Sequence, residues 1–274
     1  MNEDEATAGS VRGLNGYTIG AVDGDFGWVR DMYFHDRRWD VQYFVVDTSH
    51  WRAGKRVLIS PVALRGADHE HKVLRATLTK AEIASSPDID TEKHVSRQHE
   101  VELFQYFPYY WLTEGGAGWP DPMPSIRLAT LDLEMDEDRM GRGDPHLRSA
   151  HTVMHYYVHA MDGDMGHVAD FLYSDAPWQI SHVVVATRPF GPGRKVLVPV
   201  RWIRRVSWEA GTVDVSLMGE TVRLAPEYDG EWSAHQEYLA RVDAYYRALP
   251  SGSAGTTVPA EGTLAKKALT REPE

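Results

Sequence analysis

The sequence predicts a mainly β fold in which two small β-barrels stand in tandem, each followed by short helical segments. The chain has 274 residues, which suits two compact domains at roughly 150 residues each. The segment 23–27 recurs at 162–166, an offset of 139 residues. Each copy also contains short stretches rich in β-branched and aromatic residues, which are typical of strands.

The duplication holds without a gap along both copies. A repeat of this length is a duplicated domain and not a solenoid unit, because each copy is long enough to close its own core. The aligned pairs include Tyr17 and Tyr156, Trp39 and Trp178, Val45 and Val184, Thr48 and Thr187, Gly54 and Gly193, Leu78 and Leu217, and Pro87 and Pro226.

Short strands are expected in each copy, separated by charged turns. In the first copy they cover 28–34, 41–46, 56–59 and 73–78, and 212–217 mirrors the last of these. Asp-Gly steps at 23–24 and 162–163 predict two-residue hairpin turns, because glycine accepts the positive φ of a type I′ turn. Strands at this spacing favour a small barrel or sandwich. The glycines assigned to turns and bends are Gly24, Gly27, Gly163 and Gly166.

Helical segments are expected after each set of strands. Residues 79–82 have capping-box spacing and open a short helix that Pro87 ends. Ser96 is expected to cap a helix over 97–107. Residues 233–236 again have box spacing and lead into an amphipathic helix that stops at Pro250.

The predicted domain organisation follows from these elements and from composition. The segment 115–124 is rich in glycine and proline, and 132–144 is acidic, so both are read as an exposed linker. The C-terminal tail is too poor in large apolar groups to order itself. The predicted units are a disordered N-terminus (1–11), a first barrel with its helix (12–112), a linker (113–148), a second barrel with its helix (149–249) and a disordered tail (250–274).

Composition narrows the function classes. There are 29 basic and 40 acidic residues, a net charge of −11, which opposes non-specific binding to nucleic acid. The absence of cysteine removes disulfides, thiolate nucleophiles and cysteine metal sites. The acidic start has no apolar signal segment, and the apolar runs are far shorter than the roughly 20 residues of a membrane helix. We therefore expect a cytoplasmic protein without a transmembrane segment.

Both copies carry a series of short motifs in the same order. The motifs are Tyr17, Gly20-Ala21, Gly27-x-Val29-x-Asp31, Trp39-x-Val41-x-Tyr43-x-Val45-Val46-Asp47 and Val57-Leu58-Ile59-Ser60-Pro61, then Gly166-His167-Val168-x-Asp170-Phe171 and Trp178-x-Ile180. This series resembles the PRC-barrel family, which is named after the photosynthetic reaction-centre H subunit. The cytoplasmic domain of that subunit is a small β-barrel, and the resemblance covers most of residues 14–95 and 150–230. It implies two PRC-type barrels and a non-catalytic module that docks on a larger assembly.

Two sets of residues have metal-like spacing. Asp23, Asp25 and Asp31, with their second-copy counterparts, could be read as calcium ligands, but Gly27 and Phe34 occupy positions where an EF-hand loop needs oxygen ligands. Turn chemistry is the preferred interpretation. His151, His155 and His159 would align on a helix as a zinc site, but the repeat places 155–159 in the first strand of the second barrel. No metal or other cofactor is expected.

Catalytic motifs are not found in the sequence. A nucleophile elbow, a Walker loop and a dinucleotide-binding glycine fingerprint are all missing. We therefore expect a protein that is not an enzyme and has no catalytic residues.

Two sets of side chains are candidates for binding a partner. The aromatic residues Tyr106, Tyr109, Tyr110 and Trp111 could form a contact patch or pack on their own barrel. A second set is basic and could hold phosphate or an acidic partner, although a solvated strand edge is the commoner explanation. This set consists of Arg194, Lys195, Arg201, Arg204 and Arg205.

The leading hypothesis is a protein–protein interaction or assembly module. The alternative is a peripheral subunit on the cytoplasmic side of a photosynthetic reaction centre or another electron-transfer complex, touching the membrane surface without crossing it. An enzyme of unknown type is the third option. A homo-oligomer is compatible with all three, and the two copies are expected to pack as a pseudo-symmetric pair through equivalent faces.

Overall fold

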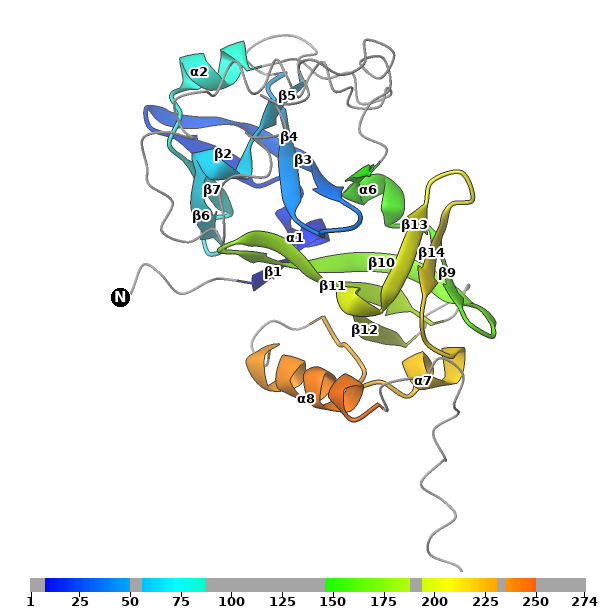
Figure 1. The fold of residues 1–274 in the computed structure, drawn as a ribbon. Coiled ribbons are helices and arrows are strands. Elements are labelled where there is room, and N and C mark those ends of the chain that lie inside the picture. Colours follow the sequence, from blue (N-terminus) through cyan, green and yellow to red (C-terminus); the bar gives the residue numbers. More distant parts are fainter. Residues whose placement is uncertain (1–7, 50–55, 87–145, 188–193, 231–234, 250–274) are drawn as a thin grey trace, which may run out of the picture.

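The structure is a computed structural model that describes residues 8–49, 56–86, 146–187, 194–230 and 235–249. Within these ranges the chain forms two separate mixed sheets of seven strands each and few helices (Figure 1). The prediction of a mainly β fold is confirmed.

The first sheet is built mostly from the first copy and has the strand order β5-β4-β3-β2-β7-β6. All neighbours on this path are antiparallel except β2 and β7, which are parallel. The expected strands at 41–46 and 56–59 are present as β4 and β5. The strands are β2 (Thr18–Ala21), β3 (Gly24–His35), β4 (Val41–Asp47), β5 (Arg56–Ile59), β6 (Leu64–Asp68) and β7 (Val73–Ala76).

The second sheet repeats this arrangement with the order β12-β11-β10-β9-β14-β13. Here too the single parallel pair on the path joins its equivalent strands, β9 and β14. Identical order and identical strand direction show that the sequence repeat is a repeat of structure. The strands are β9 (Tyr157–Ala160), β10 (Gly163–Asp175), β11 (Trp178–Ala186), β12 (Lys195–Pro199), β13 (Ile203–Ser207) and β14 (Thr212–Val215).

The expected closure of each sheet into a barrel is not found among the described residues. The hydrogen-bonded path of the first sheet ends at β5 and β6, and that of the second ends at β12 and β13. These end strands are joined by the short 3-10 turns η1 (Pro61–Ala63) and η3 (Val200–Trp202). The turns form local helical hydrogen bonds, so the end strands are connected through a bend and not through a ladder.

The hairpin glycines have structural roles, but the turns lie one residue earlier than predicted. The two-residue turns are Val22–Asp23 and Met161–Asp162, and Gly24 and Gly163 begin the next strands with φ of +115° and +129°. A Cβ added to Gly166 would overlap the carbonyl oxygen of Ala186, so this bend requires glycine. A Cβ on Gly27 would lie 2.7 Å from the carbonyl oxygen of Asp47.

The helices after each sheet follow the sequence signals. In α2 (Lys80–Ser85), Thr79 and Glu82 form both hydrogen bonds of the capping box, as predicted. The corresponding α7 (Gly219–Arg223) is followed by α8 (His235–Arg247), which buries Tyr238, Val242 and Tyr246 against the second sheet. The predicted helix over 97–107 lies outside the described residues, as does most of the predicted linker.

Each copy contributes a short strand to the other copy's sheet. β1 (Ala8–Ser10) pairs with β10 (Figure 1), and its equivalent β8 (Leu147–Ser149) pairs with β3. The sequence had placed residues 8–11 in a disordered N-terminus and 147–148 in the linker. Both predictions were wrong, because these three-residue strands depend on a partner strand more than 100 residues away in sequence.

Matched carboxylates hold the exchanged strands in place. Asp31 Oδ2 accepts a hydrogen bond from Ser149 Oγ at 2.6 Å, and its Oδ1 accepts one from the His151 amide at 3.0 Å. In the other direction, Asp170 accepts hydrogen bonds from Ser10 Oγ at 2.6 Å and from the Arg12 amide at 2.9 Å. We call these two sets of hydrogen bonds the reciprocal lock.

The copies also share one apolar core. The rings of Phe34 and Phe171 lie 5.4 Å apart between centroids, and Phe44 packs edge-on against Trp178 at 4.9 Å. The Ile180 amide donates to the Trp39 carbonyl at 2.7 Å across the same interface. Equivalent strands therefore meet through equivalent faces, which confirms the predicted pseudo-symmetric pairing.

Candidate functional site

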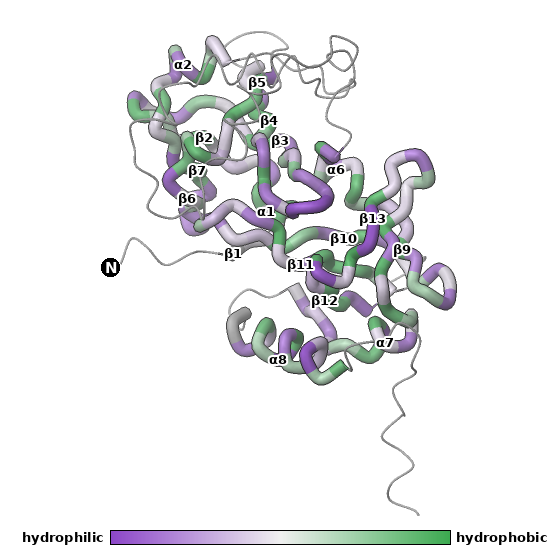
Figure 2. Tube along the Cα trace, viewed as in Figure 1, coloured by the Kyte–Doolittle hydropathy of each residue, from purple (hydrophilic) through white to green (hydrophobic). Residues whose placement is uncertain are grey.

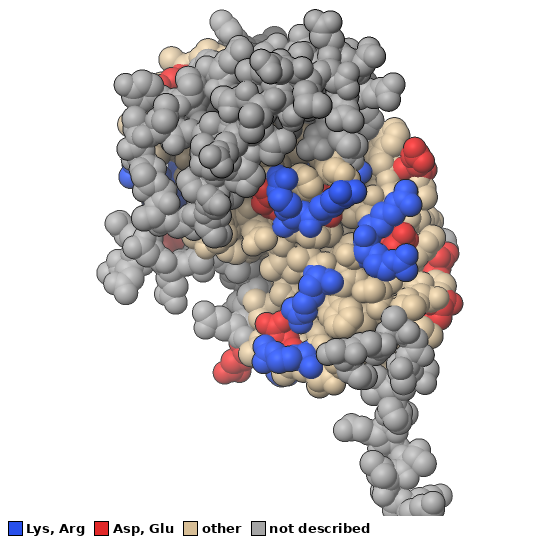
Figure 3. Space-filling model, in the orientation of Figure 1, with Lys and Arg blue, Asp and Glu red and all other residues tan. Residues whose placement is uncertain are grey.

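The predicted binding residues comprise an aromatic set and a basic set. The aromatic set of Tyr106, Tyr109, Tyr110 and Trp111 lies outside the described residues, so its prediction stays open. The basic set is described throughout, and all five of its side chains are exposed. Figure 3 shows Lys and Arg side chains on the face of the molecule where β13 and α8 lie.

Two members of the basic set have partners at the C-terminal end of the second copy. Arg194 Nη2 donates to the Ala225 carbonyl at 2.9 Å, and its Nε lies 3.4 Å from a Glu227 carboxylate oxygen. Arg201 Nη1 lies 3.5 Å from the Asp243 carboxylate in α8. These contacts help to fasten α8 and the segment before it to the second sheet.

The other basic residues occupy sheet edges. Arg204 and Arg205 lie on β13, the last strand of the second sheet, and β13 is hydrophilic along this stretch (Figure 2). Lys195 begins β12 at the opposite end. Within the described ranges none of the three side chains has an ion pair, so the structure divides the basic set and leaves an arginine pair on β13.

A pair of exposed aromatic residues lies beside this arginine pair and was missed by the sequence analysis. Tyr157 on β9 is 57% exposed, and Trp208 in the turn after β13 is 53% exposed. The Tyr157 amide donates to the Gly211 carbonyl, and the Gly211 amide donates to the Trp208 carbonyl, so both residues lie at one end of the sheet. The available signal was the difference between copies, since the first copy has Thr18 and His69 at these positions.

The aspartates with calcium-like spacing have structural partners. Asp23 Oδ1 accepts a hydrogen bond from the Lys80 amide at 2.8 Å, and Asp162 Oδ1 accepts one from the Gly219 amide at 2.6 Å. These bonds fix α2 and α7 to the hairpin turns, while Asp31 and Asp170 serve the reciprocal lock. No group of three His, Asp or Glu side chains within the described ranges is arranged to hold a metal ion.

The three histidines with zinc-like spacing lie on different elements. His151 lies in α6 (Ala150–Val153), His155 lies in the turn that follows, and His159 lies in β9. Only His159 belongs to the strand in which 155–159 were predicted, because the turn at His155 delays the start of β9. His159 Nε2 lies 2.8 Å from the Asp164 carboxylate, and its Nδ1 lies 3.7 Å from that of Asp214.

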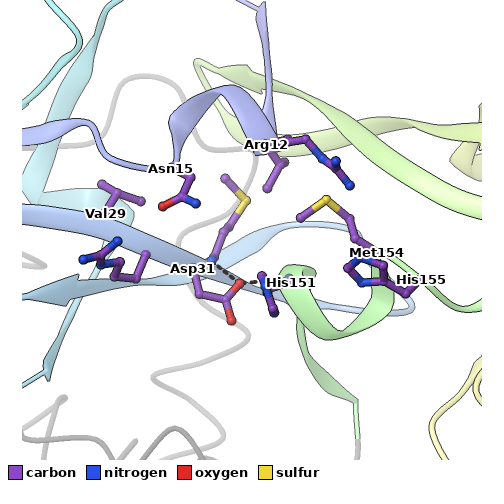
Figure 4. A pocket seen from close by; sticks show the side chains of 10 residues that line it. Arg12, Asn15, Val29, Asp31, His151, Met154 and His155 are labelled. Carbon is purple, nitrogen blue, oxygen red and sulfur yellow. Dashed lines mark hydrogen bonds between the residues drawn. The ribbon is translucent and has the colours of Figure 1, made fainter.

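A cavity of about 250 Å³ opens between the two copies, beside the reciprocal lock. Its buried lining residues are all apolar and form its floor, whereas the exposed and half-buried ones are polar or charged and form its rim. Figure 4 shows these side chains. In this view Val29 and Asn15 lie at one end, and Arg12, Met154 and His155 lie at the other. The lining residues are Val11, Arg12, Asn15, Val29, Arg30, Asp31, Met32, His151, Met154 and His155.

Comparisons with known proteins do not add a name to this geometry. Searches of protein-family models and of curated proteins find no match to the chain. Among the described helices, none is long and apolar enough to cross a membrane. The functional argument therefore rests on the residues themselves.

Proposed function

We propose that the chain is a tandem PRC-barrel-type protein that works as a non-catalytic protein–protein docking module. The resemblance of both copies to that family supports the finer fold assignment. The shared strand order and the matched bends at Gly27 and Gly166 agree with it. The reciprocal lock and the shared core favour a single rigid platform over two independently moving domains.

The observation that carries the docking proposal is the exposed aromatic pair on the second copy. Large aromatic side chains are favoured as anchors at protein interfaces, because they bury much apolar area with few rotatable bonds. Tyr157 and Trp208 have this exposure, and Arg204 and Arg205 precede the same turn. The partner that fits is a protein surface with apolar pockets flanked by acidic side chains.

A catalytic role has less support. Ser181 Oγ and His182 Nδ1 lie 2.9 Å apart, which is the distance expected for a nucleophile and its base. However, His182 is buried, and Ser181 Oγ also donates to the Leu172 carbonyl within the sheet. This pair does not line the cavity between the copies.

The proposal is tested by giving the second copy the residues of the first. The double variant Tyr157→Thr and Trp208→His removes both anchors with side chains that the same fold already carries at positions 18 and 69. Val22→Ala is the matched control, because it removes an apolar side chain that is 69% exposed on the first copy. Proteins captured from native extract by the wild type are identified, purified and rebound to each variant.

Support requires that one purified partner binds the wild type and the Val22→Ala control but not the double variant, with all three equally stable. If the purified partner binds all three proteins equally, the aromatic pair is not the docking surface. Binding to anionic vesicles that falls steeply with salt, without a protein partner, would replace the proposal with the peripheral membrane alternative.

A further inference from the structure

The cavity between the copies is built from equivalent positions of the two repeats. Arg12 in α1 (Val11–Leu14) and His151 in α6 occupy matching places, and so do Asn15 and Met154. All four line the cavity, so it lies where the pseudo-symmetry brings the two short helices together. Sites at the junction of two units are common places for ligand binding.

The rim of this cavity carries side chains that can donate hydrogen bonds to an anion. Within the described part of the chain, no hydrogen bond or ion pair reaches the side chains of Arg12, His151 or His155, and the two imidazoles lie 6.1 Å apart between centroids. Arg30 differs, because its Nε lies 3.2 Å from the Asp47 carboxylate. An anion would satisfy the donors of the first three residues.

The carboxylate of Asp31 does not accept hydrogen bonds from the side chains of Arg12 and His155. Its oxygens accept hydrogen bonds from Ser149 Oγ, the His151 amide and the Met32 amide. Burial raises the pKa of Asp31, and these hydrogen bonds together with the attraction to the His151 imidazole oppose the increase. Asp31 is therefore committed to the reciprocal lock, and the side chains of Arg12 and His155 remain available.

The backbone at His155 points to a role for its side chain. His155 has a φ of +147°, and the equivalent residue of the first copy is Gly16 with a φ of +84°. Glycine adopts this region without strain, whereas other residues are strained there and are often found at functional sites. The second copy thus carries an imidazole at a position where the fold favours glycine.

The electrostatics of His155 agree with a site that lacks its anion. Burial lowers the pKa of His155, and the positive charges of Arg12, His151 and His167 lower it further. Arg12 lies on α1, His151 on α6 and His167 on β10, so the repulsion comes from three separate elements. The acidic group on the remaining wall is Asp31 of β3.

The floor of the cavity is apolar. Val11, Val29, Met32 and Met154 are buried residues that line it. The two methionines come from different copies, and their flexible thioethers suit an apolar group of variable shape. A purely inorganic ion would leave this surface unused.

We propose that the cavity binds a small organic anion, with Arg12, His151 and His155 holding a tetrahedral oxyanion head and Met32 and Met154 contacting its apolar part. The chemical class is a phosphate monoester or an organic sulfonate. This site is independent of the docking surface at Tyr157 and Trp208, which lies on other residues.

The test measures binding of phenyl phosphate and of inorganic phosphate to the full chain by calorimetry. Phenyl phosphate is expected to bind more tightly, because only it reaches the apolar floor. Arg12→Ala should weaken phenyl phosphate binding about 10-fold or more, as expected for a lost hydrogen bond to a charged group. The matched control is Arg247→Ala, which removes the same charge from an exposed position of α8 outside the cavity and should leave binding unchanged.

A second variant separates binding from folding. His155→Gly installs the residue that the first copy uses, so the protein should stay folded with an unchanged or higher unfolding temperature and still lose binding. Benzenesulfonate, whose charge is constant, should bind several-fold more tightly near pH 6 than near pH 8, because protonation of His155 adds a positive charge to the site.

Three results would overturn the proposal. Equal losses of affinity in Arg12→Ala and Arg247→Ala would mean that anion binding depends only on the net charge of the protein. Unchanged binding in His155→Gly would remove the imidazole from the site. Equal affinity for inorganic phosphate and phenyl phosphate would exclude the organic class of ligand.

Discussion

The two copies share their backbone and differ in the side chains that face solvent. Both have the same strand order, the same parallel pair and the same carboxylate holding the partner's strand. They differ at the turn before their first sheet strand, where Gly16 corresponds to His155. They also differ where the half-buried Thr18 and His69 of the first copy correspond to the exposed Tyr157 and Trp208 of the second. The comparison teaches that the duplicated scaffold is structural, whereas the side chains proposed for function differ between the copies.

The strongest way to break the shared scaffold is to crowd one of its matched bends. Gly166→Ala should lower the free energy of unfolding by about 3 kcal/mol or more, because the new Cβ would overlap the Ala186 carbonyl at a positive φ. Gly163→Ala is the control, since its Cβ would meet no atom within 4 Å. Urea unfolding measures both, and equal losses would show that only backbone strain matters.

The reciprocal lock tests whether the copies depend on each other equally. Asp170→Ala should cost about 2 kcal/mol, because the part-buried Ser10 hydroxyl of β1 and the Arg12 amide of α1 lose their charged acceptor. Asp31→Ala should cost a similar amount from the other side. The measurement is urea unfolding of each variant, with protection of the β1 and β8 amides from hydrogen exchange. If only one variant loses stability, only one of the two exchanged strands contributes to the stability of the fold.

Substitution of His155 in its turn should have a smaller effect, and it should raise the free energy of unfolding. His155→Gly should stabilise the protein by about 1 kcal/mol, because relief of a φ of +147° exceeds the entropy that glycine adds to the unfolded chain. Gly16→His, the reverse change in the first copy, should destabilise it. Thermal unfolding of the two variants measures these changes. If the unfolding temperature changes in the same direction in both variants, backbone strain at His155 is not the cause.

The pH dependence of stability sharpens the same comparison. The pKa of His155 is lowered in the folded protein, so the unfolded chain binds its proton more readily. Stability from this residue is complete above the unfolded value of 6.5 and is lost as the pH falls through the lower folded value. His155→Gly should therefore flatten the decline below pH 6.5, measured by urea unfolding at several pH values.

The smallest expected effect is on the exposed aromatic pair. Replacing Tyr157 and Trp208 by the first-copy residues should change the free energy of unfolding by less than about 0.5 kcal/mol, as is usual for exposed positions. Differential scanning calorimetry measures this change. A loss above about 2 kcal/mol would show that the pair packs on its own sheet and is not a surface anchor.

The predictability of the fold depended on how local each signal was. The bounds of β5 and the capping box of α2 follow from adjacent residues, so periodicity and cap chemistry located them. The strands β1 and β8 have little β propensity of their own. They form because each pairs with a strand distant in sequence and is held by a carboxylate of that strand. The prediction of barrel closure was wrong for a related reason. The bends at η1 and η3 connect the end strands of each sheet, and hydrophobic periodicity does not indicate such bends.

The candidate sites were less accessible to sequence reasoning. The basic set mixed side chains that fasten α8, such as Arg201, with exposed ones, such as Arg204, because a run of like charges does not reveal its partners. Arg12 was not considered at all, since its relation to His155 arises only when the two copies pack together. The useful signal was a mismatch between aligned repeats, such as Gly16 against His155.

The reciprocal exchange of β1 and β8 has an evolutionary consequence. A single ancestral unit with the same edge segment could have donated it to an identical molecule and received one in return, forming a symmetric homodimer. Fusion of two such genes would turn an association that depends on concentration into a permanent one. Joined halves need no longer be identical, so matching positions such as Gly16 and His155 can carry different side chains.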